Sequence, residues 1–165
     1  MGQAPAVEPL EVIITRMAAV ICSSRFPTGD RAALRRMVPG HPVPLTFYRF
    51  AFSYCPENWQ SYREEWISIV AGMALMNPNA HDPHMGLGSA LAKTNYSEAR
   101  LERLLDSNGA VRRLLFLRTV RFLAAKLQPF NWVEGARFLL TSDAEKREAL
   151  NARIARDFYN YERKE

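Results

Sequence analysis

The sequence predicts an all-α protein, a compact helical fold of about eight or nine helices in two packed sub-bundles. Apolar residues recur every three or four positions along most of the 165 residues, which is the period of an amphipathic helix. No stretch keeps the strict alternation of a half-buried strand, and clusters of proline, glycine and asparagine divide the chain into helix-sized segments. A hydrophobic content of 48% with 24% charged residues indicates a folded domain.

The first half of the chain is expected to form four helices. They are expected over residues 8–23, 30–37, 44–55 and 57–76. Breaks at Pro27–Gly29 and Pro39–Pro44 separate the first three. Thr28 or Asp30 is expected to cap the second helix, because a short side-chain oxygen there can accept a free backbone N–H.

The fourth of these helices is expected to be amphipathic. Trp66, Ile69 and Met73 fall on one stripe at helical spacing, whereas Ser68 and Ala71 fall opposite. This pattern is typical of a core helix with one solvent-facing side.

The second half is expected to form five helices. They are expected over residues 87–93, 97–106, 110–126, 132–140 and 143–162. The cluster Asn77–Pro83 separates them from the first half. Ser142 with Glu145 fits a capping box at the start of the last helix, and Asn131 with Glu134 is a looser version one helix earlier.

Length and composition predict one domain over residues 1–165. Its expected parts are an N-terminal lobe 8–76, a connecting loop 77–86 and a C-terminal lobe 87–162. The first residues lack a basic segment followed by an apolar run, and nowhere do about 18 apolar residues run together. We therefore expect a cytoplasmic protein that does not contact the membrane.

Motifs for catalysis or metal binding are not found. The sequence has no Walker-type GKS or GKT, no GxSxG and no HExxH. His81, Asp82 and His84 form the densest titratable cluster, but a proline lies between the histidines and no cysteine is near, so a polar loop is favoured over a metal site. We expect no enzymatic activity, no catalytic residue, no cofactor and no bound metal.

Positive charge is concentrated in residues 107–126. This segment has five basic residues and no acidic one, which equals the net charge of +5 of the whole chain. The five are Arg112, Arg113, Arg118, Arg121 and Lys126. A helical projection puts Arg113, Arg118 and Arg121 on one edge, with apolar residues around most of the rest. The segment predicts a mostly buried helix whose arginine edge meets an anion.

Two of these basic residues fall on the apolar arc. Arg112 and Lys126 lie near the helix ends, where we expect their charged heads to reach solvent. Pairing inside the fold is the alternative for any single arginine, and the expected partners are Glu98, Glu102 and Asp106 of the preceding helix.

A second basic set, Arg31, Arg35 and Arg36, lies in the expected helix 30–37. Arg31 and Arg35 are one turn apart and repel each other slightly, which favours a partner anion, although a solvated face is the alternative. Arginine outnumbers lysine 18 to 4 in the chain. Arginine's planar fork favours bidentate contacts with phosphate.

The order of several segments resembles the CasB family, the small subunit of the type I-E CRISPR surveillance complex, Cascade. The resemblance spans about residues 10–160 and includes the basic helix. The other segments, in order, are TGDRAALRR (28–36), GLGSALAKTNYSEARLERLLDS (86–107), PFNWVEGARFLL (129–140) and ARDFY (155–159).

The resemblance implies an all-helical, non-enzymatic subunit, present as a pair, with guide RNA, target and displaced DNA strands and the other Cascade subunits as partners. Its basic surface would contact the nucleic-acid backbone and stabilise the R-loop. On the family pattern this role falls on Arg31, Arg35, Arg36, Lys93, Arg100, Arg103, Arg112, Arg113, Arg118, Arg121 and Lys126.

Two other functions fit the same charge pattern. A helical adaptor that binds acidic protein partners would tolerate it. A free-standing helical DNA-binding regulator needs polar base-reading side chains on its recognition helix, and residues 110–126 offer apolar ones.

Overall fold

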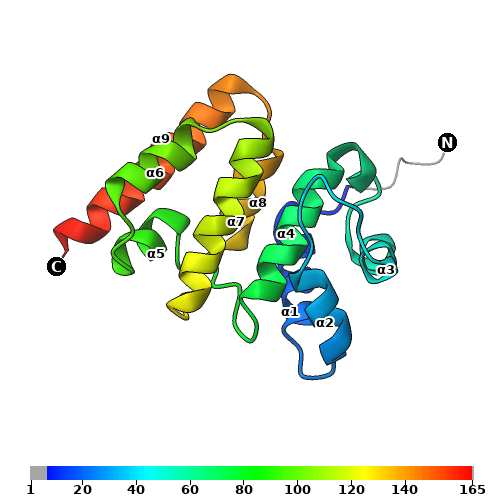
Figure 1. Cartoon of the computed structure of the whole chain (residues 1–165). Helices are drawn as coiled ribbons and strands as arrows, with labels where there is room; N and C mark the ends of the chain where they lie inside the picture. Colours follow the sequence, from blue (N-terminus) through cyan, green and yellow to red (C-terminus); the bar gives the residue numbers. More distant parts are fainter. Residues whose placement is uncertain (1–6, 165) are drawn as a thin grey trace.

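The computed structural model, which describes residues 7–164, confirms the all-α prediction. The elements in chain order (Figure 1) are α1 Leu10–Ile21, α2 Thr28–Arg35, α3 Leu45–Tyr54, the short 3₁₀ helix η1 Trp59–Tyr62, α4 Arg63–Leu75, α5 Leu87–Lys93, α6 Glu98–Asp106, α7 Gly109–Ala125, α8 Trp132–Leu140 and α9 Ala144–Arg163. Among these residues, no helix is both long enough and apolar enough to cross a membrane.

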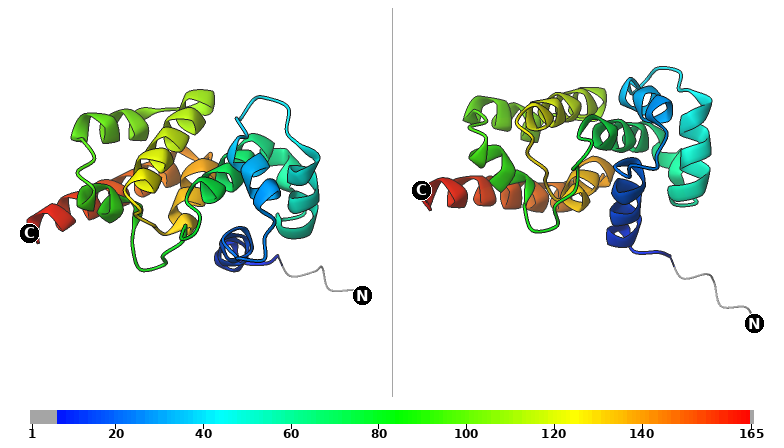
Figure 2. Two further views of the ribbon diagram at one scale, coloured as in Figure 1. Left: turned by 60° about the horizontal axis from the view of Figure 1, so that its bottom comes forward. Right: turned by 90° about the horizontal axis from the view of Figure 1, so that it is seen from below.

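The helices form an elongated body with α3 at one end and the C-terminal part of α9 at the other (Figure 1). α4, α7 and α8 lie between these ends, and the two further views in Figure 2 agree. α2 and α7 both pack against α4, and α1 contacts α8. One cluster of buried apolar side chains runs from Ile13 to Phe158, so the predicted lobes 8–76 and 87–162 share a core. Their separation into two lobes stays a prediction.

The helix expected over residues 57–76 differs from the prediction. It begins with the turn η1, and in α4 every residue from 66 to 74 is buried. Ser68 and Ala71, expected on a solvent-facing side, are therefore inside. The hydroxyl of Ser68 is satisfied because it donates to the backbone carbonyl of Glu64 at 2.8 Å. The prediction of a one-sided helix is wrong because α1, α2, α7 and α8 all pack against α4.

The predicted caps of the last two helices hold in one case and shift in the other. Asn131 caps α8, since its side chain accepts the Val133 N–H at 3.0 Å. Glu134 does not complete a capping box, because its carboxylate accepts the Leu87 N–H at 3.3 Å and the Asn131 N–H donates to the Met85 carbonyl. At α9 the capping side chain is Asp143, which accepts the Lys146 N–H at 3.0 Å, so the predicted cap Ser142 is wrong by one residue. Both residues are good N-caps, and the sequence alone does not choose between neighbours.

The start of α2 also differs. The helix begins at Thr28, and its N-cap is Pro27 with no side-chain hydrogen bond. The Pro27 carbonyl accepts the Arg31 N–H at 3.0 Å. The predicted cap by Thr28 or Asp30 is therefore wrong, and Asp30 instead pairs with Arg49 at 3.0 Å.

A glycine lets α5 approach α9 closely. A Cβ on Gly88 would lie 2.1 Å from the backbone oxygen of Ile154 and 2.8 Å from the backbone nitrogen of Phe158. Only glycine fits this contact, since neither backbone atom can move aside without the helix. The contact fixes the position of α9, which forms one wall of a groove against α6.

Candidate nucleic-acid interface

A pocket of about 320 Å³ opens between α6 and α7. It is lined by Tyr96, Arg100, Arg103, Leu115, Arg118 and Phe122, and we call it the basic pocket. Tyr96 lies just before α6, Arg100 and Arg103 lie on α6, and the other three lie on α7. On each helix the lining residues are three or four positions apart, so each helix presents one stripe to the pocket.

The aromatic side of the basic pocket is rigidly held. Thr119 Oγ1 donates to the Leu115 carbonyl at 2.9 Å, so the Tyr96 hydroxyl, also 2.9 Å from Thr119 Oγ1, is the donor in that second bond. The rings of Tyr96 and Phe122 meet edge to face with centroids 5.1 Å apart. The guanidinium carbon of Arg100 lies 5.8 Å from the centroid of each ring. Cation–π attraction thus holds Arg100 over the aromatic pair.

The three arginines of the basic pocket are exposed, and none of them takes part in the ion pairs found within residues 7–164. Arg121, about one turn further along α7, is exposed too. Lys126 follows the end of α7, and its ammonium lies 5.7 Å from the centroid of the Phe122 ring. These side chains therefore form a run of positive charge from α6 along α7 that no ion pair among the described residues involves, as a surface for anions requires.

Arg112, which we expected to reach solvent, is only 4% exposed, and that expectation is wrong. Its Nε donates to the Phe138 carbonyl and its Nη1 to the Ser107 carbonyl, both at 3.1 Å. Its guanidinium lies 3.5 Å from the centroid of the Phe138 ring. Burial, and secondly the charge of Arg147, lowers the pKa of Arg112 to about 10. Arg112 thus links the turn between α6 and α7 to α8. The expectation failed because this turn and α8 cover the start of α7, which the sequence suggested was open to solvent.

Arg113 is half-buried and pairs with Glu65 of α4, with 3.2 Å between Nη1 and Oε1. An internal partner was one of the two possibilities for this arginine, but the partner lies on α4 and not on the helix that precedes α7. Arg113 is therefore turned toward the fold, apart from the exposed arginines of α7.

The guanidinium of Arg31 also forms its hydrogen bonds inside the fold. Its Nε donates to the Ile21 carbonyl at 2.8 Å and its Nη2 to the Ser23 carbonyl at 2.7 Å. These acceptors lie at the end of α1, whose last carbonyls have no partner within the helix. Arg31 thus closes α1, which accounts for an arginine there without any external anion.

Arg35, Arg36 and Lys93 are exposed at the ends of α2 and α5, and none of them lines the basic pocket. In the right-hand view of Figure 2, α2 lies along the same edge of the molecule as α6 and α7. That the three residues belong to one interface with the basic pocket stays a prediction.

The sequence reasoning missed the apolar part of the basic pocket. Tyr96 precedes Arg100 by four residues, and Phe122 follows Arg118 by four. Residues four apart on a helix face the same side, so Arg118 and Phe122 in the predicted helix 110–126 were an available signal. Tyr96 lies just before the helix predicted over 97–106, so the helical spacing does not place it beside Arg100.

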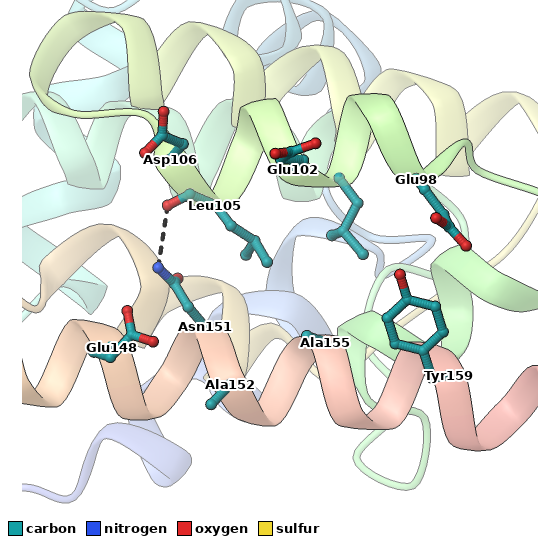
Figure 3. A pocket seen from close by; sticks show the side chains of 10 residues that line it. Glu98, Glu102, Leu105, Asp106, Glu148, Asn151, Ala152, Ala155 and Tyr159 are labelled. Atoms are coloured by element: carbon teal, nitrogen blue, oxygen red, sulfur yellow. Dashed lines mark hydrogen bonds between the residues drawn. The ribbon is translucent and has the colours of Figure 1, made fainter.

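The other side of α6 is acidic. A groove of about 530 Å³ between α6 and α9 is lined by Glu98, Leu101, Glu102, Leu105, Asp106, Glu148, Asn151, Ala152, Ala155 and Tyr159, and we call it the acidic groove (Figure 3). Asn151 Nδ2 donates to the Leu105 carbonyl at 3.1 Å and so links the two helices. Desolvation, followed by the charge of Glu98, raises the pKa of Tyr159. Four carboxylates make this side repel phosphate.

The histidine loop serves the fold. His81 Nδ1 accepts the Trp132 N–H at 3.1 Å, and the carboxylate of Asp82 accepts the His84 N–H at 2.9 Å. Within residues 7–164 no three His, Cys, Asp or Glu side chains are grouped to hold a metal ion.

The structure defines a small all-helical protein with three exposed arginines around a pocket between two helices, back to back with an acidic groove. The family model of the CRISPR-associated protein Cse2 matches residues 30–159, so the chain belongs to the Cse2 family. No curated protein is similar enough to count as a relative.

Solved structures share this fold. CasB from Thermus thermophilus superimposes with a TM-score of 0.73 at 21% identity, over 93% of this chain and 99% of that one. A CRISPR-associated protein of the Cse2 family, also from Thermus thermophilus, gives 0.71 at 21% identity, over 92% and 98%. A chain of the Escherichia coli Cascade bound to a PAM-containing double-stranded DNA target gives 0.68 at 19% identity, over 92% and 97%. The resemblance to the CasB family noted in the sequence is confirmed.

Proposed function

We propose that the protein is the small subunit of a type I-E CRISPR Cascade complex and that it binds nucleic-acid backbone without reading sequence. Membership of the Cse2 family supports the first part, and an E. coli chain of similar fold belongs to Cascade bound to DNA. The observation that carries the second part is the basic pocket, where three exposed arginines surround one opening and take no part in the ion pairs of the described residues.

The proposed role is to stabilise the R-loop formed by guide RNA, target strand and displaced strand. Exchange of DNA pairing for RNA–DNA pairing is close to balanced in free energy, so sequence-independent backbone contacts can favour it. Arginine forks suit phosphate oxygens, and each neutralised phosphate also releases counterions. Arg103, Arg118 and Arg121 fit this role best, because they are exposed and not held by carboxylates in the described fold.

The partners in this proposal are the guide RNA, the target and displaced DNA strands, the other Cascade subunits and a second copy of the chain. The subunit contributes binding and no chemical step, and it works in the cytoplasm with the rest of the complex.

A salt series with the purified full-length chain tests the binding role. Fluorescence anisotropy would follow binding of a labelled single-stranded DNA, with the logarithm of affinity plotted against the logarithm of salt concentration. The triple variant Arg103→Ala, Arg118→Ala, Arg121→Ala should lower the magnitude of the slope by about 2, since each phosphate contact to a single strand contributes about 0.7.

The matched control is Arg16→Ala, Arg49→Ala, Arg137→Ala, which removes the same charge from three arginines outside the basic pocket that pair with Glu8, Asp30 and Glu11. It should leave the slope within about 0.5 of the unaltered chain. Equal slopes for both triple variants would remove the basic pocket from the interface. A flat salt dependence of the unaltered chain would favour the adaptor that binds acidic proteins.

Membership of the complex needs a separate test. Affinity-tagged protein co-expressed with the other Cascade subunits and a guide RNA should co-purify with both. Failure to assemble would contradict the Cascade role, whatever the result of the salt series.

A further inference from the structure

The basic pocket contains more than backbone binding requires. Phosphate needs cations at an accessible surface, and an exposed arginine such as Arg121 supplies that alone. The basic pocket adds Tyr96, Leu115 and Phe122 to its arginines and encloses about 320 Å³. Apolar side chains contribute nothing to phosphate binding, so a ligand with both an anionic part and a flat apolar part fits the lining better.

Arg100 is the residue that joins the two parts. Its guanidinium lies 5.8 Å from the centroids of both rings, and the Tyr96 ring is anchored through its hydroxyl to Thr119. A guanidinium held in this way is a planar, charged surface on which a nucleobase can stack. Arg103 and Arg118 then stand beside the same opening for flanking phosphates.

We propose that the basic pocket receives one unpaired nucleobase of a single strand, stacked on Arg100, while Arg103 and Arg118 hold the adjoining phosphates. This inference rests on the proposed function and narrows its ligand to single-stranded nucleic acid. Bases inside a duplex are stacked and paired, and extracting one costs a few kcal/mol. Stacking accepts every base, so the pocket distinguishes single from double strands without reading sequence.

Abasic DNA separates base contacts from phosphate contacts. The full-length chain would be titrated at fixed salt with a single-stranded oligonucleotide and with an abasic oligonucleotide of the same length and the same number of phosphates. Loss of the bases should weaken binding about tenfold, as is usual for a stacked base. For Arg100→Lys, which keeps the charge but removes the planar surface, the ratio of the two affinities should fall to about twofold.

Arg49→Lys is the matched control, since Arg49 is exposed on α3, pairs with Asp30 and does not line the basic pocket. It should keep the tenfold ratio, and both lysine variants should keep the salt slope of the unaltered chain. Equal affinity of the unaltered chain for normal and abasic strands would overturn the inference, and so would an unchanged ratio in Arg100→Lys. In either case a normal salt slope would leave the backbone-binding function standing. A missing salt slope in the unaltered chain would overturn both.

Discussion

The two sides of α6 carry opposite charges although the helix has only nine residues. Glu98, Glu102 and Asp106 follow one another at four-residue spacing and line the acidic groove, whereas Arg100 and Arg103 line the basic pocket. Residues two positions apart point to different sides of a helix. Summed over residues 57–106 the charge is net negative, and this sum hides a positive surface. Charge has to be counted by helix face to locate a binding surface.

The difference in charge also determines which side of the protein is expected to face nucleic acid. Phosphate is attracted to the basic pocket on the α7 side of α6 and repelled from the acidic groove on its other side. A nucleic acid is therefore expected to approach from one side only, which leaves the acidic groove pointing away from it. If the two sides are independent, a change on one of them should leave the other unaffected.

Moving α9 should disturb the acidic groove and leave the basic pocket intact. Gly88→Ala places a Cβ 2.1 Å from the Ile154 oxygen, so α9 has to move away from α5. We expect the free energy of unfolding, measured by urea denaturation, to fall by about 3 kcal/mol. The salt slope of DNA binding by the folded protein should not change, because α9 contributes no residue to the basic pocket.

Gly29→Ala is the matched control for this change. Gly29 lies in α2, and a Cβ there meets no atom within 4 Å. Alanine has a higher helix propensity than glycine, so Gly29→Ala should be more stable than the unaltered chain by up to about 1 kcal/mol. Equal stability of Gly88→Ala and Gly29→Ala would show that α5 and α9 are not in close contact at Gly88.

Charge reversal on the basic side should abolish much of the DNA affinity. Arg103→Glu with Arg118→Glu removes two expected phosphate contacts and adds repulsion at the same places. We expect single-stranded DNA to bind about 100-fold more weakly at low salt, equivalent to about 2.7 kcal/mol. Glu102→Gln with Glu148→Gln changes two residues of the acidic groove and should alter affinity by no more than about twofold. A comparable loss in both pairs would mean that the two sides of α6 do not act separately.

Loss of a buried arginine should lower the free energy of unfolding, whereas loss of an exposed arginine should leave it nearly unchanged. Arg112→Met removes two hydrogen bonds to backbone carbonyls inside the protein. The free energy of unfolding should fall by about 2 kcal/mol, the usual cost of losing charged hydrogen bonds. Arg35→Met at an exposed position should change it by less than about 0.5 kcal/mol. A reduced salt slope in Arg112→Met would contradict its assignment to the fold.

The sequence predicts the helices well because each depends on local periodicity and local breaks. The helices over 87–93 and 132–140 are found with the predicted bounds. It fails at α4, since a fully buried helix carries no one-sided pattern, and burial depends on which other helices surround it.

The candidate site is harder to predict, because a helical projection gives the direction of each side chain but not the groups that it contacts in the fold. The projection placed Arg113, Arg118 and Arg121 on one edge. Arg113 nevertheless meets Glu65, which is 48 residues away in sequence. Arg112 is covered by a carbonyl from α8, 26 residues away. Only the folded chain separates arginines that hold the protein together from those that are free to bind.

A lower pH should reduce the stability of the fold without altering DNA binding. His81 Nδ1 has to be unprotonated to accept the Trp132 N–H at the start of α8. Burial lowers the pKa of His81, an effect that the charge of Asp82 partly offsets. The folded chain therefore binds fewer protons than the unfolded chain between the two pKa values, so stability rises with pH through that window and falls as pH drops below about 6.5.

Urea unfolding at pH 7.5 and 5.5 should show a loss of about 1 kcal/mol, the usual value of a helix cap. His81→Asn keeps an acceptor for Trp132 but does not titrate, so it should lack this part of the pH dependence. Arginine side chains stay charged throughout this range. The salt slope of DNA binding should therefore be the same at both pH values in both proteins, and a slope that changed with His81 would connect the histidine loop to the basic pocket.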